Sequence, residues 1–335
     1  MFKALLDINK ISFPGLGIDE FSVNEVAFSV FGIDVAWYGI IVTLAIAVVC
    51  ARVYAGAVKL GYKIDDILDY FIYSILFGII GARIYYVVFY GLDRYIVTDG
   101  SFWHNLSESF MNIIAIWNGG IAIYGGIIAI VITVIVVSKI KKIPILPILD
   151  LAGHGAMIGQ AIGRWGNFFN AEAHGVETDI FCRMGLTNAF GITICYHPTF
   201  FYESLWNVIG FILIFIFYKH RKYGGQIFLM YCSWYGFGRM FIEGLRTDSL
   251  YIGATSIRVS QLLGFLLFVI GTALLIYFGI KNKGVTSEEY ISSVKASLSC
   301  SASVPEDAIG IIKSGNETTT NEASKEDEDN DSENN

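Results

Sequence analysis

The sequence predicts an all-α polytopic membrane protein with about seven transmembrane helices, and three observations support this fold class. Of the 335 residues, 54% are hydrophobic and only 16% are charged, which is too apolar for a soluble chain of this length. The apolar residues are grouped, because residues 112–138 and 259–280 contain no charged side chain and each segment exceeds the roughly 20 residues that cross a bilayer. Basic residues also gather in alternate connections between the apolar segments.

The chain divides into three parts. Residues 1–35 contain Asp and Glu and lack a basic start followed by a small-residue cleavage site, so we expect an extracytoplasmic segment and no cleavable signal peptide. Residues 36–283 form the membrane domain and residues 284–335 the tail. The predicted spans are 37–49, 67–90, 112–138, 148–165, 198–218, 226–243 and 259–280.

The positive charges predict the orientation of the chain, because Lys and Arg near the ends of spans are retained on the cytoplasmic side. Such residues follow the first, third, fifth and seventh spans: Arg52, Lys59, Lys63, Lys139, Lys141, Lys142, Lys219, Arg221, Lys222, Lys281 and Lys283. The intervening connections are poor in basic residues. We therefore expect the N-terminus outside and the C-terminus in the cytoplasm.

The acidic charge of the chain is concentrated in its tail. Residues 285–335 contain 12 Asp or Glu and three Lys, a net charge of -9, so the overall charge of -7 leaves +2 for the rest. A segment of this composition cannot bury enough apolar surface to fold alone. We predict a disordered cytoplasmic tail that takes no part in the chemistry.

The cysteine pattern argues against a metal site. Five cysteines are scattered without a CxxC pair or a histidine at ligand spacing, so no metal and no other cofactor is expected. Cys182 and Cys195 share one predicted outer loop, where a disulfide and two free thiols are both open alternatives.

Charged residues within the spans are the first indication of function. An ionisable side chain near the bilayer centre costs about 2.5 to 3.5 kcal/mol, so each needs a partner or a role. Five such residues lie toward the outer ends of their spans: Arg83, Arg164, Glu203, Arg239 and Glu243. Their common depth indicates either one site or a ring of side chains that snorkel to the interface.

The most specific local pattern surrounds Arg164. Gly163 and Gly166 flank this arginine and weaken the helix where polar groups accumulate, and broken backbone at membrane depth is tolerated where it lines a cavity. The arginine fork is suited to a phosphodiester, and Asn167, Asn170 and Glu172 follow it. Gly155, Gly159 and Gly163 recur every fourth residue and favour close helix packing instead of chemistry.

Three further clusters are polar. Residues 117–126 contain four glycines, Asn118 and Tyr124 in an uncharged span, and a phenol there needs a hydrogen-bond partner. Residues 197–203 begin with His-Pro and end at Glu203, whose carboxylate needs a cation. Arg239 and Glu243 are four residues apart, so they either form a plain intrahelical salt bridge or belong to a site.

The alternatives to an enzyme are a transporter or channel and a structural scaffold. Broken helices and buried Arg/Glu pairs also occur along transport paths, but the sequence contains no internal repeat. A scaffold predicts polar residues that are scattered or absent. Two arginines that face a phosphate, with carboxylates to orient them, favour an enzyme site for an anionic phospholipid head group.

Together these clusters resemble the motifs of the prolipoprotein diacylglyceryl transferase family, over about residues 36–280. The motif residues are Gly163, Arg164, Gly166, Asn167, Asn170, Glu172, Gly175, His197, Pro198, Tyr202, Glu203, Tyr235, Gly236, Arg239, Glu243 and Arg246. Tyr38, Gly39, Arg83, Tyr86 and Asp150 also look like family positions. One departure is Tyr124, where many members carry a histidine before the paired glycines.

The resemblance implies that the thiolate of the lipobox cysteine in a prolipoprotein signal peptide attacks C3 of the diacylglycerol moiety of phosphatidylglycerol. A thioether forms and glycerol 1-phosphate leaves, without a metal or another cofactor. The expected partners are therefore phosphatidylglycerol, prolipoprotein signal peptides and membrane lipids, and no nucleic acid. The expected location is the plasma membrane of a bacterium, with the site toward the outer leaflet.

The resemblance and the clusters together suggest residue roles. The expected catalytic residues are Arg239, Tyr124, Glu243, Glu203 and Asn167. The expected phosphatidylglycerol-binding residues are Arg164, Arg239, Asn167, Asn170, Glu172, Gly175, Tyr38 and Tyr235. The general base stays open: we expect Tyr124 to orient lipid or thiol, while Glu243 or Glu203 organises the arginines and assists deprotonation.

Overall fold

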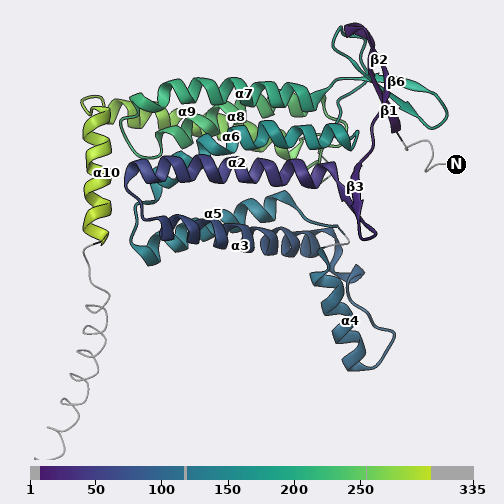
Figure 1. The fold of residues 1–335 in the computed structure, drawn as a ribbon, viewed down its shortest axis with the longest axis horizontal. Coiled ribbons are helices and arrows are strands. Elements are labelled where there is room, and N and C mark those ends of the chain that lie inside the picture. Colours follow the sequence, from purple (N-terminus) through teal and green to yellow (C-terminus); the bar gives the residue numbers. More distant parts are fainter. Residues whose placement is uncertain (1–7, 117–118, 254, 303–335) are drawn as a thin grey trace, which may run out of the picture.

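The computed structural model describes residues 8–116, 119–253 and 255–302 as a helical bundle with a small sheet at one end (Figure 1). The helices are α2 (Trp37–Leu60), α3 (Ile64–Gly91), α4 (Phe102–Ile114), α5 (Ile123–Lys141), α6 (Ile145–Phe169), α7 (Thr199–Phe217), α8 (Gln226–Leu245), α9 (Val259–Lys281) and α10 (Ser287–Ala302). Short 3-10 helices are η1 (Pro14–Leu16), η2 (Leu92–Arg94) and η4 (Tyr218–His220). The strands are β1 (Ile8–Phe13), β2 (Ile18–Ser22), β3 (Val26–Val30), β4 (Ile33–Ala36), β5 (Met184–Asn188) and β6 (Thr193–Tyr196).

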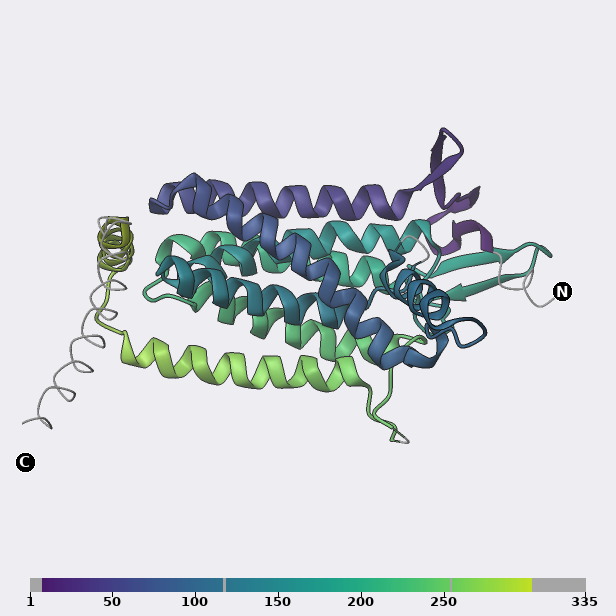
Figure 2. The same cartoon turned by 90° about the horizontal axis from the view of Figure 1, so that it is seen from below.

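The long helices confirm the predicted class of polytopic membrane protein. Among the described residues, six helices are long and apolar enough to cross a membrane: α2, α3, α5, α6, α9 and α7 with its 3-10 extension. The seventh predicted span corresponds to α8, which has 20 residues but is less apolar because it carries Arg239 and Glu243. These helices run side by side, whereas α4 and α10 lie across the bundle axis (Figures 1 and 2).

The two ends of the bundle differ in what covers them. The four-stranded sheet lies at one end, which we call the sheet end, and α10 crosses the other, which we call the α10 end (Figure 1). The sheet has the order β2-β1-β5-β6, and all its neighbouring strands are antiparallel. It joins the N-terminal segment to the connection between α6 and α7. The separate hairpin β3-β4 leads directly into α2.

The sheet is an addition to the predicted all-α class. Ile11, Met184, Leu186 and Phe200 form its buried apolar core. The strands are only four to six residues long, and they belong to segments that are separated by more than 140 residues of sequence, since Ile11 pairs with Leu186. Local sequence patterns do not predict a pairing between strands so far apart in the chain. The small core nevertheless holds the start of α7 in place, because Phe200 is part of it.

The third predicted span is wrong as a continuous helix. α4 ends at Ile114 and α5 begins at Ile123, and between them Gly119 and Gly120 adopt positive φ values of 81° and 78°. Such angles favour glycine and end helical geometry. Trp117 and Asn118, which were part of the predicted cluster, lie outside the described residues. The long uncharged run therefore contains the last residues of α4, the break and most of α5.

Arg83 of α3 holds this break in place. Its guanidinium donates hydrogen bonds to the backbone oxygens of Asn112, Ile113, Gly119 and Gly120, over 2.6 to 2.9 Å. The first two are terminal carbonyls of α4, which have no partner within the helix. Arg83 is only 6% exposed. The backbone oxygens on either side of the break therefore compensate its buried charge.

The prediction of a disordered tail from residue 284 is wrong for residues 287–302, which form α10. A capping box starts this helix, since Thr286 N donates to Glu289 Oε2 at 2.8 Å and Glu289 N donates to Thr286 Oγ1 at 3.3 Å. Tyr290, Val294 and Leu298 are spaced four apart and are buried. Residues 303–335 lie outside the described residues. The prediction used the average composition of the whole tail and therefore missed the short amphipathic segment at its start.

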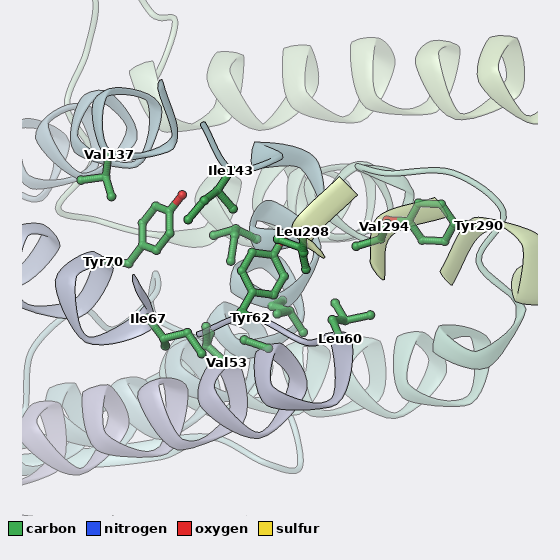
Figure 3. Close-up of a cluster of buried hydrophobic side chains, with 13 residues drawn as sticks. Val53, Leu60, Tyr62, Ile67, Tyr70, Val137, Ile143, Tyr290, Val294 and Leu298 are labelled. Atoms are coloured by element: carbon green, nitrogen blue, oxygen red, sulfur yellow. The ribbon is translucent and has the colours of Figure 1, made fainter. Parts of the chain in front are cut away.

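The apolar stripe of α10 packs into the largest buried cluster of the structure (Figure 3). The other members of this cluster come from α2, α3, α5, α6 and two connections: Val53, Ala57, Leu60, Tyr62, Ile67, Tyr70, Val137, Ile143, Ile148 and Leu151. α3 packs chiefly on α5, and α2 chiefly on α6. α10 therefore joins both helix pairs at one end of the bundle.

Candidate active site

Two arginines from different helices contact the carboxylate of Glu203, which lies at the sheet end of α7. Glu203 Oε1 accepts a hydrogen bond from Arg164 Nη2 of α6 at 2.5 Å, and Oε2 accepts one from Arg239 Nη1 of α8 at 2.7 Å. The second Nη of Arg239 lies 2.6 Å from Oε2 of Glu243, one turn later on the same helix. These four residues alternate in charge, and we call them the charge cluster.

The charge cluster is largely removed from solvent. Glu203 and Glu243 are each 2% exposed, whereas the side chain of Arg164 is 21% exposed. Buried charges are retained only when their partners compensate the lost hydration. The alternative of a plain intrahelical pair between Arg239 and Glu243 accounts for only one of the three contacts. Neither arginine snorkels away from the bundle, because both are directed at a buried carboxylate.

A second polar group extends the charge cluster at the end of α6. Arg164 Nη1 donates to Asn167 Oδ1 at 3.3 Å. The amides of Asn167 and Asn170 both donate to Glu172 Oε1, at 3.0 and 3.2 Å. The residues that the sequence placed in one pocket are therefore connected by hydrogen bonds. Glu172 acts as the acceptor for both amides.

The predicted break of the helix at residues 163–167 is wrong. α6 continues to Phe169, and irregular backbone begins only beyond it, where Ala171 and Ala173 have positive φ values of 49° and 56°. Gly166 is needed for close packing, because a Cβ there would lie 2.8 Å from the ring of Tyr38. Packing of this kind outweighs the weak helical preference of glycine. Tyr38 of α2 therefore packs against the end of α6, two residues beyond Arg164.

Gly175 lies outside the charge cluster and has a packing role. Its backbone forms an isolated bridge with Arg246, and a Cβ would lie 2.7 Å from Cβ of His197. Arg246 makes two hydrogen bonds to the carboxylate of Asp248, at 2.9 and 2.6 Å. Burial alone would raise the pKa of Asp248, but the hydrogen bonds and charge of Arg246 hold this pKa below its ordinary value.

Tyr124 has a partner that sequence reasoning missed. Its hydroxyl lies 2.7 Å from Oγ of Ser260, so the phenol links α5 to the start of α9. Nothing in the sequence indicated that Ser260, a single serine at the start of an apolar helix, would be the partner of Tyr124. Tyr235 lies one turn before Arg239 on α8 and stacks on Tyr231, with ring centroids 5.9 Å apart.

Arg258 is a second residue that the sequence did not single out. Its guanidinium donates to the backbone oxygen of Glu243, close to the end of α8. Gln261 donates in the same way to the backbone oxygen of Met240, at 3.1 Å. Residues of α9 thus hold the last turn of α8, which carries the final member of the charge cluster. The sequence treated Arg258 only as part of a loop with few basic residues.

The connection after α6 contains two free thiols. Cys182 and Cys195 are not bonded to each other, so of the two alternatives the structure has the pair of free thiols. Cys182 Sγ lies 3.5 Å from the hydroxyl of Tyr202, which lies 3.2 Å from Nδ1 of His197. Partial burial lowers the pKa of His197 below its ordinary value.

Two other predictions concern residues away from the charge cluster. Asp150 is at the α10 end, where its carboxylate accepts hydrogen bonds from the backbone N–H groups of Gly225 and Phe228. It therefore caps the start of α8 and does not belong to the site. Among the described residues, no group of three or more His, Cys, Asp or Glu side chains could hold a metal ion.

The charge cluster and its neighbours are chemically suited to an anion. A guanidinium offers five N–H donors in a planar fork, and Arg164 uses two of its nitrogens on Asn167 and Glu203. Two arginines held by one carboxylate cannot move apart without leaving a buried charge unpaired. Guanidiniums fixed in this way are the kind of donor that binds phosphate and carboxylate groups in proteins.

Comparison with known proteins places the chain in a family. Residues 25–277 match the sequence model of prolipoprotein diacylglyceryl transferase. The chain is 42% identical to the phosphatidylglycerol–prolipoprotein diacylglyceryl transferase of Listeria welshimeri, over 77% of this chain and 91% of that protein. It is 42% identical to the protein of that name from Finegoldia magna, over 80% of this chain and 100% of that protein. The counterpart from Enterococcus faecalis is 40% identical, over 76% and 90%. The chain therefore belongs to the prolipoprotein diacylglyceryl transferase family.

Proposed function

We propose that this chain transfers the diacylglyceryl group of phosphatidylglycerol to the thiol of the lipobox cysteine in a prolipoprotein. The products are a thioether and glycerol 1-phosphate, and the reaction is the first step of lipoprotein maturation. The names of the relatives state the same lipid donor and the same class of protein acceptor. Phosphatidylglycerol, the signal peptide and the surrounding membrane lipids are the partners.

One observation carries this proposal: Arg164 and Arg239, from different helices, share the buried carboxylate of Glu203. The shared carboxylate fixes the spacing of the two guanidiniums before any substrate binds. Their remaining N–H donors bind the phosphodiester of the lipid and stabilise the charge that develops on the departing phosphate. Asn167, Asn170 and Glu172 extend this pocket beyond Arg164.

The chemical step requires a thiolate. The cysteine thiol loses its proton, the sulfur forms a bond to C3 of the diacylglyceryl group, and the C3–O bond breaks with its electron pair on the phosphate oxygen. Glu243 is the better candidate for the base, because an arginine occupies each oxygen of Glu203, whereas Arg239 pairs with only one oxygen of Glu243. Tyr124, bonded to Ser260, orients the substrates and does not take the proton.

The remaining predicted residues have positioning roles in this proposal. Tyr38 packs against Gly166 near the end of α6, and Tyr235 precedes Arg239 by one turn of α8, so both would line the lipid head group. Gly175 allows the connection after α6 to pack against the end of α8. Its contribution is therefore to the shape of the site and not to direct contact with phosphate.

We place the sheet end outside and the α10 end in the cytoplasm of a bacterial cell. The basic residues near the ends of the spans support this orientation, since Lys59 lies in the last turn of α2 and Lys63, Lys142 and Lys283 follow α2, α5 and α9, which end at the α10 end. The charge cluster then lies toward the outer leaflet of the plasma membrane. The lipobox cysteine of a signal peptide reaches this depth after its apolar segment has entered the membrane.

The test is transfer of labelled diacylglyceryl from phosphatidylglycerol vesicles to a lipobox peptide by the purified chain. Product is expected with the wild type and is expected to disappear with Arg164→Ala and Arg239→Ala. Arg183→Ala is the matched control, because Arg183 lies at the same end but bonds only to nearby backbone oxygens. A folded wild type that forms no thioether would overturn the proposal and favour a scaffold or transporter.

A further inference from the structure

A layer of uncharged polar side chains lies directly beneath the charge cluster. Arg164, Glu203 and Arg239 belong to α6, α7 and α8, and each of these helices carries a polar residue one turn closer to the α10 end. These residues are Gln160, Asn207 and Tyr235, and Gln160 in turn contacts Tyr231. We call these four residues the polar layer. Residues four apart share a helix face, so the polar layer continues the faces that carry the charges.

Two members of the polar layer have unmet hydrogen-bonding groups. Asn207 is fully buried, and neither its Oδ1 nor its Nδ2 has a partner among the described residues. Gln160 Nε2 donates to the Tyr231 hydroxyl at 3.0 Å, but Gln160 Oε1 is buried without a partner. Buried polar groups in folded proteins are almost always bonded to protein or to ordered water. A leucine at position 207 would fill similar space without this cost.

The surroundings of Asn207 exclude a simple exchange of partners. Ser204 of α7 already donates to the backbone oxygen of Ala161, at 2.9 Å. Trp206 Nε1 donates to the backbone oxygen of Trp234, and Trp234 Nε1 donates to the backbone oxygen of Trp206, both at 2.9 Å. The neighbouring polar groups on α7 and α8 are thus satisfied. Asn207 is fully buried and follows Glu203 by four residues, so the two side chains share one face of α7.

Glu203 has acceptor capacity that its arginines do not use. A carboxylate offers about four acceptor sites, and the hydrogen bonds from Arg164 and Arg239 use one on each oxygen. A buried ion pair is stable only when its remaining lone pairs are also satisfied. The unmet donor nearest along α7 belongs to Asn207, one turn below.

We propose that Asn207 and Gln160 hold buried water that completes the hydrogen bonding of the Glu203 carboxylate and thereby positions Arg164 and Arg239. Asn207 is then a positioning residue of the transfer reaction, acting through Glu203 and not on the substrate. This inference rests on the proposed function for its kinetic readout. Water is the occupant that fits, because an amide and a carboxylate one turn apart can be bridged by a molecule that both donates and accepts.

The main test compares Asn207→Leu with Asn207→Thr in the full-length protein. Asn207→Leu is expected to lower kcat roughly 10- to 100-fold, because a small displacement of positioned groups has effects of this size. Asn207→Thr retains a hydroxyl and is expected to restore most of kcat. The melting temperature of Asn207→Leu is expected to stay within a few degrees of the wild type, because leucine fills similar space and replaces the amide together with the water that it holds. Loss of kcat without loss of stability separates positioning from general damage.

His154→Phe is the matched control. His154 is also fully buried on α6 with two ring nitrogens that lack partners, but it lies ten residues from Arg164 and stacks on Phe211. Its replacement is expected to leave kcat unchanged. If Asn207→Leu melts more than a few degrees below the wild type, Gln160→Met replaces it as the deciding variant, with the same expected loss of kcat.

An infrared measurement tests the proposal independently of turnover. The carboxylate stretch assigned to Glu203 by its absence in Glu203→Gln is expected to shift in Asn207→Leu and to remain in place in His154→Phe. Wild-type kcat and an unshifted carboxylate band in the deciding variant would overturn the inference. A wild type that forms no product overturns the proposed function alone, and the infrared shift then still decides the role of Asn207.

Discussion

Asp150 and Glu203 are both buried carboxylates, only 1% and 2% exposed, but they lie at opposite ends of the bundle and have different kinds of partner. Asp150 accepts hydrogen bonds from two backbone N–H groups in the first turn of α8, at 3.0 and 2.9 Å. Glu203 accepts from the side chains of two arginines. A carboxylate bonded to backbone fastens one helix to another. A carboxylate bonded to guanidiniums holds mobile cations in place for a ligand.

The regions around the two carboxylates differ in the same way. The α10 end is filled by the apolar cluster of Figure 3, and Arg221 there lies over the ring of Tyr218 at 4.0 Å. The sheet end contains the charge cluster, the amides that extend it and the polar layer. The largest apolar cluster of the described residues lies at one end, and the proposed site lies at the other, so changes at the two ends should affect different measurements.

The largest expected effect is that of Glu203→Gln. This change leaves two partly buried arginines without their shared anion, and loss of one partner from a buried pair costs up to about 3 to 5 kcal/mol of folding free energy. Transfer to a lipobox peptide should fall together with thermal stability in detergent. A variant that keeps both would contradict the assignment of Glu203 as the organiser of the arginines.

Leu298→Ala should have the next largest effect, and on stability alone. Leu298 is 9% exposed in the apolar cluster of α10, and truncation of a buried leucine costs about 2 to 5 kcal/mol. The melting temperature should fall while kcat per folded molecule stays constant. Ser299→Ala, on the exposed side of the same helix, is the control, and a change in kcat with Leu298→Ala would break the separation of the two ends.

Asp150→Ala should cost about 1 to 2 kcal/mol, the usual effect of removing a side-chain cap from a helix. The loss should appear in thermal unfolding and not in turnover, in contrast to Glu203→Gln. Asp150→Asn keeps one acceptor oxygen and should lose less. If either variant abolished transfer at full stability, Asp150 would have to be counted with the site.

Tyr124→Phe should have the smallest effect. It removes one hydrogen bond to Ser260, worth about 0.5 to 1.5 kcal/mol, and turnover should fall by no more than roughly tenfold. A general base contributes about 10²- to 10⁴-fold, so a loss in that range would make the phenol the proton acceptor. Ser260→Ala removes the same bond from the other side and should match Tyr124→Phe.

Much of the architecture is determined by the sequence, because spans and local pairs depend on neighbours along the chain. Long uncharged runs predict the membrane helices, and spacing of four residues predicts the contact between Arg239 and Glu243. The same reasoning failed at Gly119 and Gly120, where an uncharged run contains a break. An apolar run indicates that a segment is compatible with the bilayer, but it does not predict where a helix within that segment ends.

Only the tertiary structure decided which groups the ionisable side chains within the membrane spans contact. The common depth of Arg83, Arg164 and Arg239 left open either one site or a ring of snorkelling side chains. In the structure Arg83 binds backbone oxygens, while the other two share Glu203. The sequence likewise could not show that Asp150 caps α8 or that Asn207 lies without a partner below Glu203. Burial requires that each polar group find some partner, and this requirement can be seen in the sequence. Which partner it finds depends on how distant helices pack, and no local pattern contains that information.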